Sequence, residues 1–160
     1  MKNRRAFITG ISSSYLKKSE INFLKKYRPW GVILFSRNIH DVKQTKKLTD
    51  DIKSCFKDKK YPILIDEEGG KVSRLKNIID NSAFSSRYFG NLFVNNRKRF
   101  LYEYKIYINN ISQILDEIGV NINCVPVLDV IRNKTSKIIG DRSFSKNPKI
   151  VSRLGDFCIE

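Results

Sequence analysis

The chain has little of what many catalytic and cofactor sites are built from. Its 160 residues include one histidine and three cysteines, and the cysteines are too far apart for a C-x-x-C pair. No Walker loop, G-x-G-x-x-G segment or Ser/Cys–His arrangement is present. These absences argue against a zinc site, a nucleotide-binding loop and a thiol or serine hydrolase. We expect no cofactor and no metal.

Cysteine use and hydrophobic run length bear on the compartment. Cys55, Cys124 and Cys158 each lie among apolar residues, so we expect buried, reduced side chains. No apolar run approaches the roughly 20 residues of a membrane span. The basic start of the chain is followed by residues too polar for a signal peptide. The sequence therefore predicts a cytoplasmic protein without a membrane partner.

The charge is strongly unbalanced, with 31 Lys and Arg against 16 Asp and Glu, a net charge of +15. Such a charge can indicate a nucleic-acid partner. Here the basic residues are scattered, with small local clusters such as residues 57–60 and 97–99, and no nucleic-acid-binding motif accompanies them. We expect no nucleic-acid partner, while a basic binding module stays open as an alternative.

Short apolar runs alternate with longer amphipathic stretches. The pattern predicts strands at residues 7–11, 31–35, 62–65 and 122–128, and helices at 19–27, 42–55, 97–118 and from 148 onward. The weak signal between residues 77 and 96 indicates a loop with short helical turns. This order predicts one α/β domain with a parallel sheet, whose sites lie at the carboxyl ends of the strands.

Four residues are predicted to mark helix ends. Ser19 and Asp41 have side chains that suit an N-cap. Gly119 follows the longest helix as a C-terminal cap. Pro148 suits the first position of the last helix.

Two polar segments follow predicted strands, DEEGGKVSR at residues 66–74 and IGDRSF at 139–144. Asp66 comes directly after an apolar strand, where its carboxylate could accept hydrogen bonds from sugar hydroxyls. Arg74 could donate a fork of hydrogen bonds to the same ligand. The simpler alternatives are an aspartate that orders the loop and a surface arginine. A Gly-Gly pair within the first segment allows a sharp turn or a close approach of ligand.

Four further polar residues are assigned roles by position. Asp129 is predicted at the end of the fourth strand, with a loop-organising role. In the second segment Arg142 is the predicted ligand contact, and Asp141 is predicted to brace the loop. His40, the only histidine, lies near a helix start and is predicted to be structural.

Four stretches together resemble successive signatures of family 3 glycoside hydrolases. They are residues 30–39 (WGVILFSRNI), 65–75 (IDEEGGKVSRL), 125–130 (VPVLDV) and 139–144 (IGDRSF). Their order and spacing agree from about residue 7 to residue 160. The sequence is most similar to the cytoplasmic beta-N-acetylhexosaminidase branch, which acts in peptidoglycan recycling.

The resemblance implies a (β/α)8 TIM barrel, of which residues 1–160 would hold the first four β-α units as the N-terminal half of one domain. It implies a retaining glycosidase that removes terminal N-acetylglucosamine from muropeptides and is a monomer when full length. By position, Asp66, Arg74 and Arg142 match sugar-binding residues of the family. The nucleophile and the acid/base are expected downstream of Glu160, so we expect residues 1–160 alone to be poorly soluble and not to hydrolyse glycosides.

The sequence also departs from the family pattern. Lys71 stands where the family often has arginine, and residues 78–82 replace a proline-containing stretch. The K-H-F-P-G-H-G-like segment, which supplies substrate-binding and acid/base residues, is absent. Two alternatives remain open: a family 3 beta-glucosidase, and a non-catalytic half-barrel that binds sugar or nucleic acid.

Overall fold

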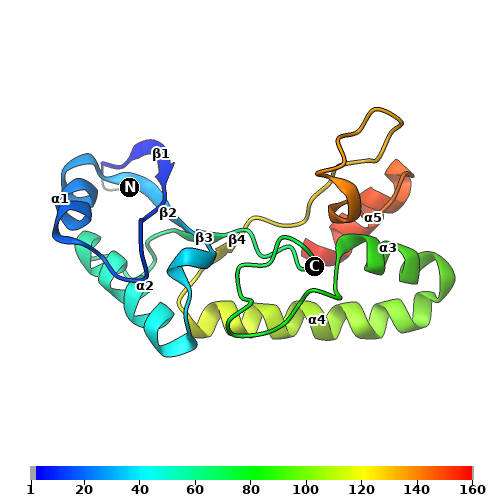
Figure 1. Cartoon of the computed structure of the whole chain (residues 1–160), viewed down its shortest axis with the longest axis horizontal. Coiled ribbons are helices and arrows are strands. Elements are labelled where there is room, and N and C mark those ends of the chain that lie inside the picture. The colour runs from blue at the N-terminus through cyan, green and yellow to red at the C-terminus, as the bar shows by residue number, and fades with distance from the viewer. Residues whose placement is uncertain (1–2, 160) are drawn as a thin grey trace. The chain divides into compact units, whose positions relative to one another are not determined.

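The computed structural model describes residues 3–159 and divides the chain into two compact units (Figure 1). Unit 1 consists of Met1–Asp66, Arg74–Ile79 and Gln113–Asn123. Unit 2 consists of Glu67–Ser73, Asp80–Ser112 and Cys124–Glu160. The chain therefore passes between the units several times, and the segment after Asp66 contributes to both.

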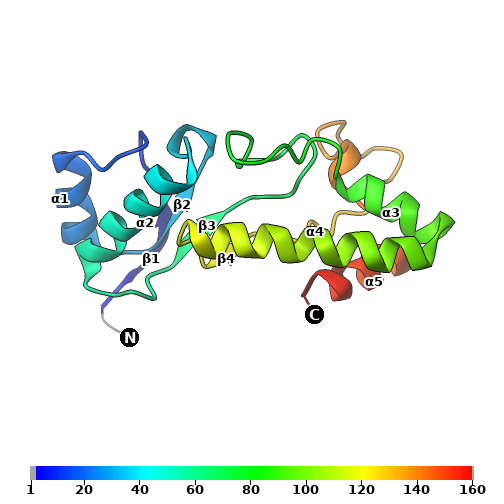
Figure 2. The same ribbon diagram turned by 90° about the horizontal axis from the view of Figure 1, so that it is seen from below.

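Unit 1 contains the parallel sheet that the alternating pattern predicts. Its strands are β1 (Arg5–Thr9), β2 (Pro29–Leu34), β3 (Ile63–Ile65) and β4 (Ile122–Asn123), paired in that order and all parallel (Figure 2). All three residues of β3 are buried, as expected for an apolar strand inside a parallel sheet. The α/β class is confirmed.

The helices of unit 1 begin and end at recognisable signals. In α2 (Val42–Phe56) the Asp41 side chain accepts a hydrogen bond from the Gln44 backbone N–H at 2.7 Å, so this predicted cap is confirmed. The predicted Ser19 cap is wrong, because Ser19 lies inside α1 (Lys18–Tyr27). There the Glu20 carboxylate takes the capping role by accepting hydrogen bonds from backbone N–H groups that precede the helix.

The fourth strand is much shorter than the sequence predicts. Only Ile122 and Asn123 pair with β3, and residues 125–130 form no strand. Pro126 has no N–H to donate to a ladder, which favours an early end to the pairing. Asp129 therefore does not end a strand, and its backbone carbonyl accepts a hydrogen bond from the Ser143 hydroxyl instead.

Unit 2 is mainly helical. It contains α3 (Ser86–Asn95), most of α4 (Arg97–Glu117), a short 3-10 turn η2 (Gly140–Arg142) and α5 (Pro148–Ile159). Helix α3 falls where we predicted a loop with short turns. The core of unit 2 is formed by aromatic and aliphatic side chains: Phe89, Phe100, Tyr104, Phe144, Val151 and Leu154.

The predicted ends of the later helices are confirmed. Pro148 is the first residue of α5, and Gly119 follows α4 with a φ of +78°, a conformation that favours glycine. A side chain at Gly119 would also meet the Thr49 hydroxyl at 2.5 Å. The last turns of α4 and the turn after it are therefore fixed to α2 within unit 1.

The cysteines do not all behave as expected. Cys55 and Cys158 are half-buried and Cys124 is exposed, so the prediction of a buried side chain is wrong for Cys124. It follows β4 directly, at the point where strand pairing ends. Within residues 3–159, no helix is long and apolar enough to cross a membrane.

Candidate functional site

The carboxyl ends of β1, β2 and β3 lie along one edge of the sheet, because the strands are parallel and paired in order. The chain leaves β3 at Asp66 and returns to unit 1 at Arg74. Asp66 Oδ2 and Arg74 Nη2 are 3.6 Å apart, and about a quarter of each side chain is exposed. The pair predicted from sequence is therefore brought together at the predicted edge, within reach of solvent.

The segment that begins at Arg74 is anchored to the rest of unit 1 by buried contacts. Leu75 is completely buried, and the Asn77 side-chain amide donates to the Ile39 carbonyl at 2.9 Å. The Arg74 guanidinium also lies over the Phe35 ring, with its central carbon 5.6 Å from the ring centroid. Stacking and anchoring together orient the guanidinium beside Asp66.

The loop after β2 is attached to the loop after β1 through a buried amide. Asn38 is fully buried, and its Nδ2 donates to the carbonyls of Ile11 at 3.2 Å and Ser13 at 2.8 Å. Its Oδ1 accepts from the Phe35 backbone N–H at 2.8 Å. All of the amide's polar atoms are thus used to fix the two loops relative to each other.

Arg142, the third predicted sugar-binding residue, lies in unit 2. Its Nε and Nη2 donate to the two oxygens of Glu68, both at 2.8 Å. The Glu68 side chain is 6% exposed and that of Arg142 26%. Asp141, which was predicted to brace the loop, makes a long contact of 3.9 Å with the ammonium of exposed Lys71. Arg142 is anchored by Glu68 instead.

The Gly-Gly turn in the first polar segment is tightly packed within unit 2. Gly69 and Gly70 have φ values of +76° and +57°. A side chain at Gly69 would meet the Phe84 carbonyl at 2.3 Å and the Tyr107 hydroxyl at 2.5 Å. The turn therefore requires glycine for both backbone conformation and space, and the sharp turn predicted from sequence is confirmed.

A second carboxylate of this segment, Glu67, is 2% exposed. It accepts hydrogen bonds from the Ser73 hydroxyl at 3.2 Å and from the Asn81 amide at 3.3 Å. Burial, together with the negative charge of Glu67, raises the pKa of the Tyr107 hydroxyl. Glu67 thus orders the turn from inside unit 2.

Sequence reasoning missed Glu68, Phe35 and Arg37. Each lies in a segment singled out above, but its partner is distant in sequence or is a backbone group. The side chain of His40 is 80% exposed, and its Nδ1 lies 3.5 Å from the carboxylate of neighbouring Asp41. Within residues 3–159, no group of three or more His, Cys, Asp or Glu side chains could hold a metal ion.

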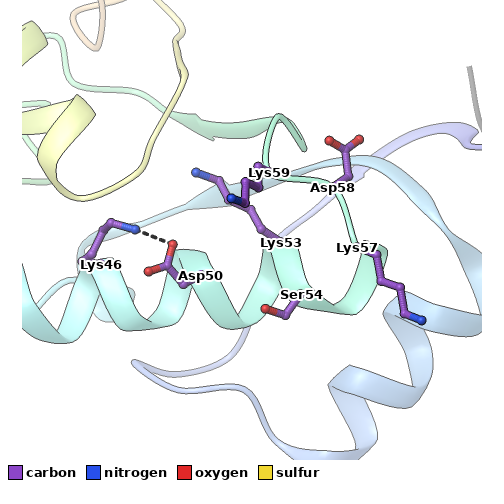
Figure 3. A pocket seen from close by; sticks show the side chains of 7 residues that line it. All are labelled: Lys46, Asp50, Lys53, Ser54, Lys57, Asp58 and Lys59. Atoms are coloured by element: carbon purple, nitrogen blue, oxygen red, sulfur yellow. Dashed lines mark hydrogen bonds and ion pairs between the residues drawn. The ribbon is translucent and has the colours of Figure 1, made fainter.

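A hollow of unit 1, away from the Asp66–Arg74 pair, is lined mainly by basic residues (Figure 3). It is formed by Lys46, Asp50, Lys53, Ser54, Lys57, Asp58 and Lys59. These residues belong to the end of α2 and the turn that leads into β3, at the amino end of that strand. Burial and the nearby charge of Lys46 lower the pKa of Lys53, whose ammonium donates to the Gly119 carbonyl at 2.7 Å. Lysines are favoured at a helix C-terminus by its partial negative charge, so this hollow needs no ligand to explain it.

Comparison with known proteins identifies the family. The family described as "Glycosyl hydrolase family 3 N terminal domain" matches residues 8–160. The chain is 31% identical to Beta-hexosaminidase A of Pseudoalteromonas piscicida over 82% of its length and 22% of the relative's. It is 29% identical to a Beta-hexosaminidase of Thioalkalivibrio sulfidiphilus, over 90% of the chain and 41% of the relative.

Solved structures give the same result. One is similar with a TM-score of 0.81 and 27% identity over 95% of this chain and 44% of the other: NagZ from Neisseria gonorrhoeae in complex with N-trifluoroacetyl-D-glucosamine. A family 3 beta-N-acetylglucosaminidase from Paenibacillus is similar with a TM-score of 0.78 and 25% identity, over 96% of this chain and 28% of the other. The chain thus spans less than half the length of each of these relatives.

Proposed function

The chain belongs to glycosyl hydrolase family 3, and on that basis we propose that it supplies the sugar-binding part of a beta-N-acetylhexosaminidase. The observation that carries the proposal is the Asp66–Arg74 pair at the carboxyl edge of the sheet. Its 3.6 Å separation is longer than a good hydrogen bond. A carboxylate and a guanidinium each offer several acceptor or donor positions, so the pair can also serve a ligand.

The proposed roles follow from the chemistry of the two groups. The Asp66 carboxylate accepts hydrogen bonds from sugar hydroxyls, while the Arg74 guanidinium donates to hydroxyl oxygens. Arg142 is proposed as a further sugar-binding residue on the strength of the motif in which it lies. Glu68 then has a positioning role, since it holds the arginine side chain through two hydrogen bonds.

We further propose that residues 1–160 form the first four β-α units of a single (β/α)8 barrel domain. The four parallel strands in sequential order support this, because a barrel is assembled from such neighbours. The relatives are more than twice as long as the part that this chain matches. The nucleophile and acid/base of a retaining mechanism are accordingly proposed to lie outside residues 1–160.

The proposed substrate is a muropeptide with a terminal N-acetylglucosamine, handled in the cytoplasm by a monomeric enzyme. Support for the sugar comes from the relatives, which are named beta-hexosaminidase and beta-N-acetylglucosaminidase. The peptidoglycan origin rests on the motif resemblance alone.

The proposal is tested by the sugar preference of the 160-residue chain. In an NMR titration, N-acetylglucosamine is expected to shift the amide signals of Asp66 and Arg74 with a dissociation constant in the millimolar range, about −4 kcal/mol. Glucose should bind more weakly. Equal or tighter binding of glucose would favour a beta-glucosidase, and no binding of either sugar would overturn the proposal. Turnover of an aryl N-acetylglucosaminide by this chain would show that the catalytic groups lie within it.

A further inference from the structure

The guanidinium groups of two arginines lie over the ring of Phe35, which follows β2 at its carboxyl end. The central carbon of Arg37 is 4.6 Å from the ring centroid and that of Arg74 is 5.6 Å away. Arg74 faces Asp66. The edge of unit 1 therefore brings two positive groups to the same aromatic ring, and one of the two also faces a carboxylate.

Of these two arginines, Arg37 has no carboxylate partner within residues 3–159. Its Nε donates to the Ile11 carbonyl at 3.0 Å, and its guanidinium lies over the Phe35 ring. The residue is exposed. A guanidinium has five N–H donors, and the contact with Ile11 uses one of them, so Arg37 keeps donors that a ligand could use.

Arg37 and Phe35 both pack closely against Gly10, which has no side chain. A side chain there would meet Arg37 Nη2 at 3.2 Å and the Phe35 ring at 3.3 Å. The loop that carries Arg37 is further fixed by the buried amide of Asn38, which bonds the Ile11 carbonyl as well. A guanidinium held in this way loses little conformational entropy when it binds a ligand.

We propose that Arg37 is a specificity-determining residue that binds a carboxylate carried by the glycoside substrate, next to the sugar held by Asp66 and Arg74. This inference rests on the proposed function and names an anionic substrate class for the same site. A guanidinium edge matches the two coplanar oxygens of a carboxylate. A neutral sugar needs no such group, since Asp66 and Arg74 already supply an acceptor and donors.

The alternative is that Arg37 is an ordinary exposed arginine that covers an aromatic ring. The chain offers a matched control for that alternative in unit 2. Arg153 on α5 is also exposed, and its central carbon lies 4.9 Å from the centroid of the Phe157 ring. It stacks at a similar distance but lies far along the chain from the strand ends of the sheet.

The test compares two ligands that differ in one charge, 4-carboxyphenyl N-acetyl-β-D-glucosaminide and its methyl ester. The unmodified 160-residue chain is expected to bind the carboxylate about fivefold more tightly at low salt, with the preference falling as salt is added. Arg37→Gln should abolish the preference, and Arg37→Lys should retain only part of it. Arg153→Gln should leave it unchanged.

A second measurement follows Arg37 directly. Its Nε–H NMR signal, identified by its loss in Arg37→Gln, should shift with the carboxylate ligand and not with the ester. Equal affinity for the two glycosides would overturn the inference, and so would a preference that survives in folded Arg37→Gln. In either case, binding of N-acetylglucosamine would still support the proposed function. Failure of N-acetylglucosamine and both glycosides to bind would overturn both.

Discussion

Glu68 and Arg142, 74 residues apart in sequence, form a two-point ion pair with both N–O distances at 2.8 Å. The carboxylate is almost completely buried. The pair connects the Gly-Gly turn to the second polar segment within unit 2. It makes the position of a proposed sugar-binding arginine depend on a residue of the first motif.

Breaking this pair should destabilise unit 2. Arg142→Lys keeps the charge but loses the two-point contact, so we expect a loss of about 2 kcal/mol of unfolding free energy. Glu68→Gln should cost less, because Arg142 can turn toward water. Urea unfolding measures both. The exposed Arg99–Glu103 pair on α4 is the control, since Arg99→Lys should change little; equal effects at the two sites would contradict the assignment.

Packing of α3 against the second polar segment should depend on Gly90. A side chain at Gly90 would lie 1.9 Å from the Phe144 carbonyl, which is backbone and cannot move aside. We expect Gly90→Ala to lower the unfolding free energy by about 3 kcal/mol in urea unfolding. Gly155→Ala on α5 is the matched control, because its only close neighbour within 3 Å is the end of the flexible Leu128 side chain. A Gly90→Ala chain as stable as Gly155→Ala would contradict the packing described here.

The start of α1 should make stability depend on acid pH. Burial opposes ionisation of Glu20, but hydrogen bonds from the backbone N–H groups of Lys17 and Ser12 dominate and lower its pKa below 4.5. The folded chain therefore binds fewer protons than the unfolded chain in this range, and stability is lost as pH falls below about 4.5. Glu20→Gln should cost about 1 kcal/mol at pH 7 and flatten the decline measured by thermal unfolding. A decline as steep as in the unmodified chain would contradict this role.

Thiol reactivity should separate the three cysteines. Burial raises the pKa of the Cys55 and Cys158 thiols, so both should react slowly with a disulfide reagent at pH 7. Cys124 is exposed and should react first. Cys124→Ser is expected to remove the fast phase, and three thiols that react at one rate would contradict the described burial.

Much of unit 1 could be predicted from local pattern. Apolar runs located β2 and β3, and Asp41 and Gly119 marked ends of α2 and α4, because these signals act over a few residues of chain. The parallel order followed from alternation alone. The closeness of Asp66 and Arg74 was predicted as well, because both belong to the short polar segment that follows β3.

The remaining features depend on partners that local pattern does not specify. The apolar run after Asn123 is typical of a strand, yet Pro126 cannot donate to a ladder and pairing stops before it. Cys124 is exposed at the point where β4 ends earlier than predicted. Glu68 binds Arg142, which is distant in sequence. Arg37 contacts a backbone carbonyl of Ile11 and the ring of Phe35, and neither contact has a sequence signal.

The central claim, that the Asp66–Arg74 edge binds N-acetylglucosamine, is tested most directly by one pair of variants. Asp66→Asn removes the acceptor charge while keeping the side-chain shape, and Asp50→Asn removes a carboxylate of the basic hollow. In NMR titrations of the 160-residue chain, Asp66→Asn is expected to weaken N-acetylglucosamine binding at least about tenfold, or 1.4 kcal/mol, and Asp50→Asn to leave it unchanged. Unaltered binding by a folded Asp66→Asn chain would contradict the account.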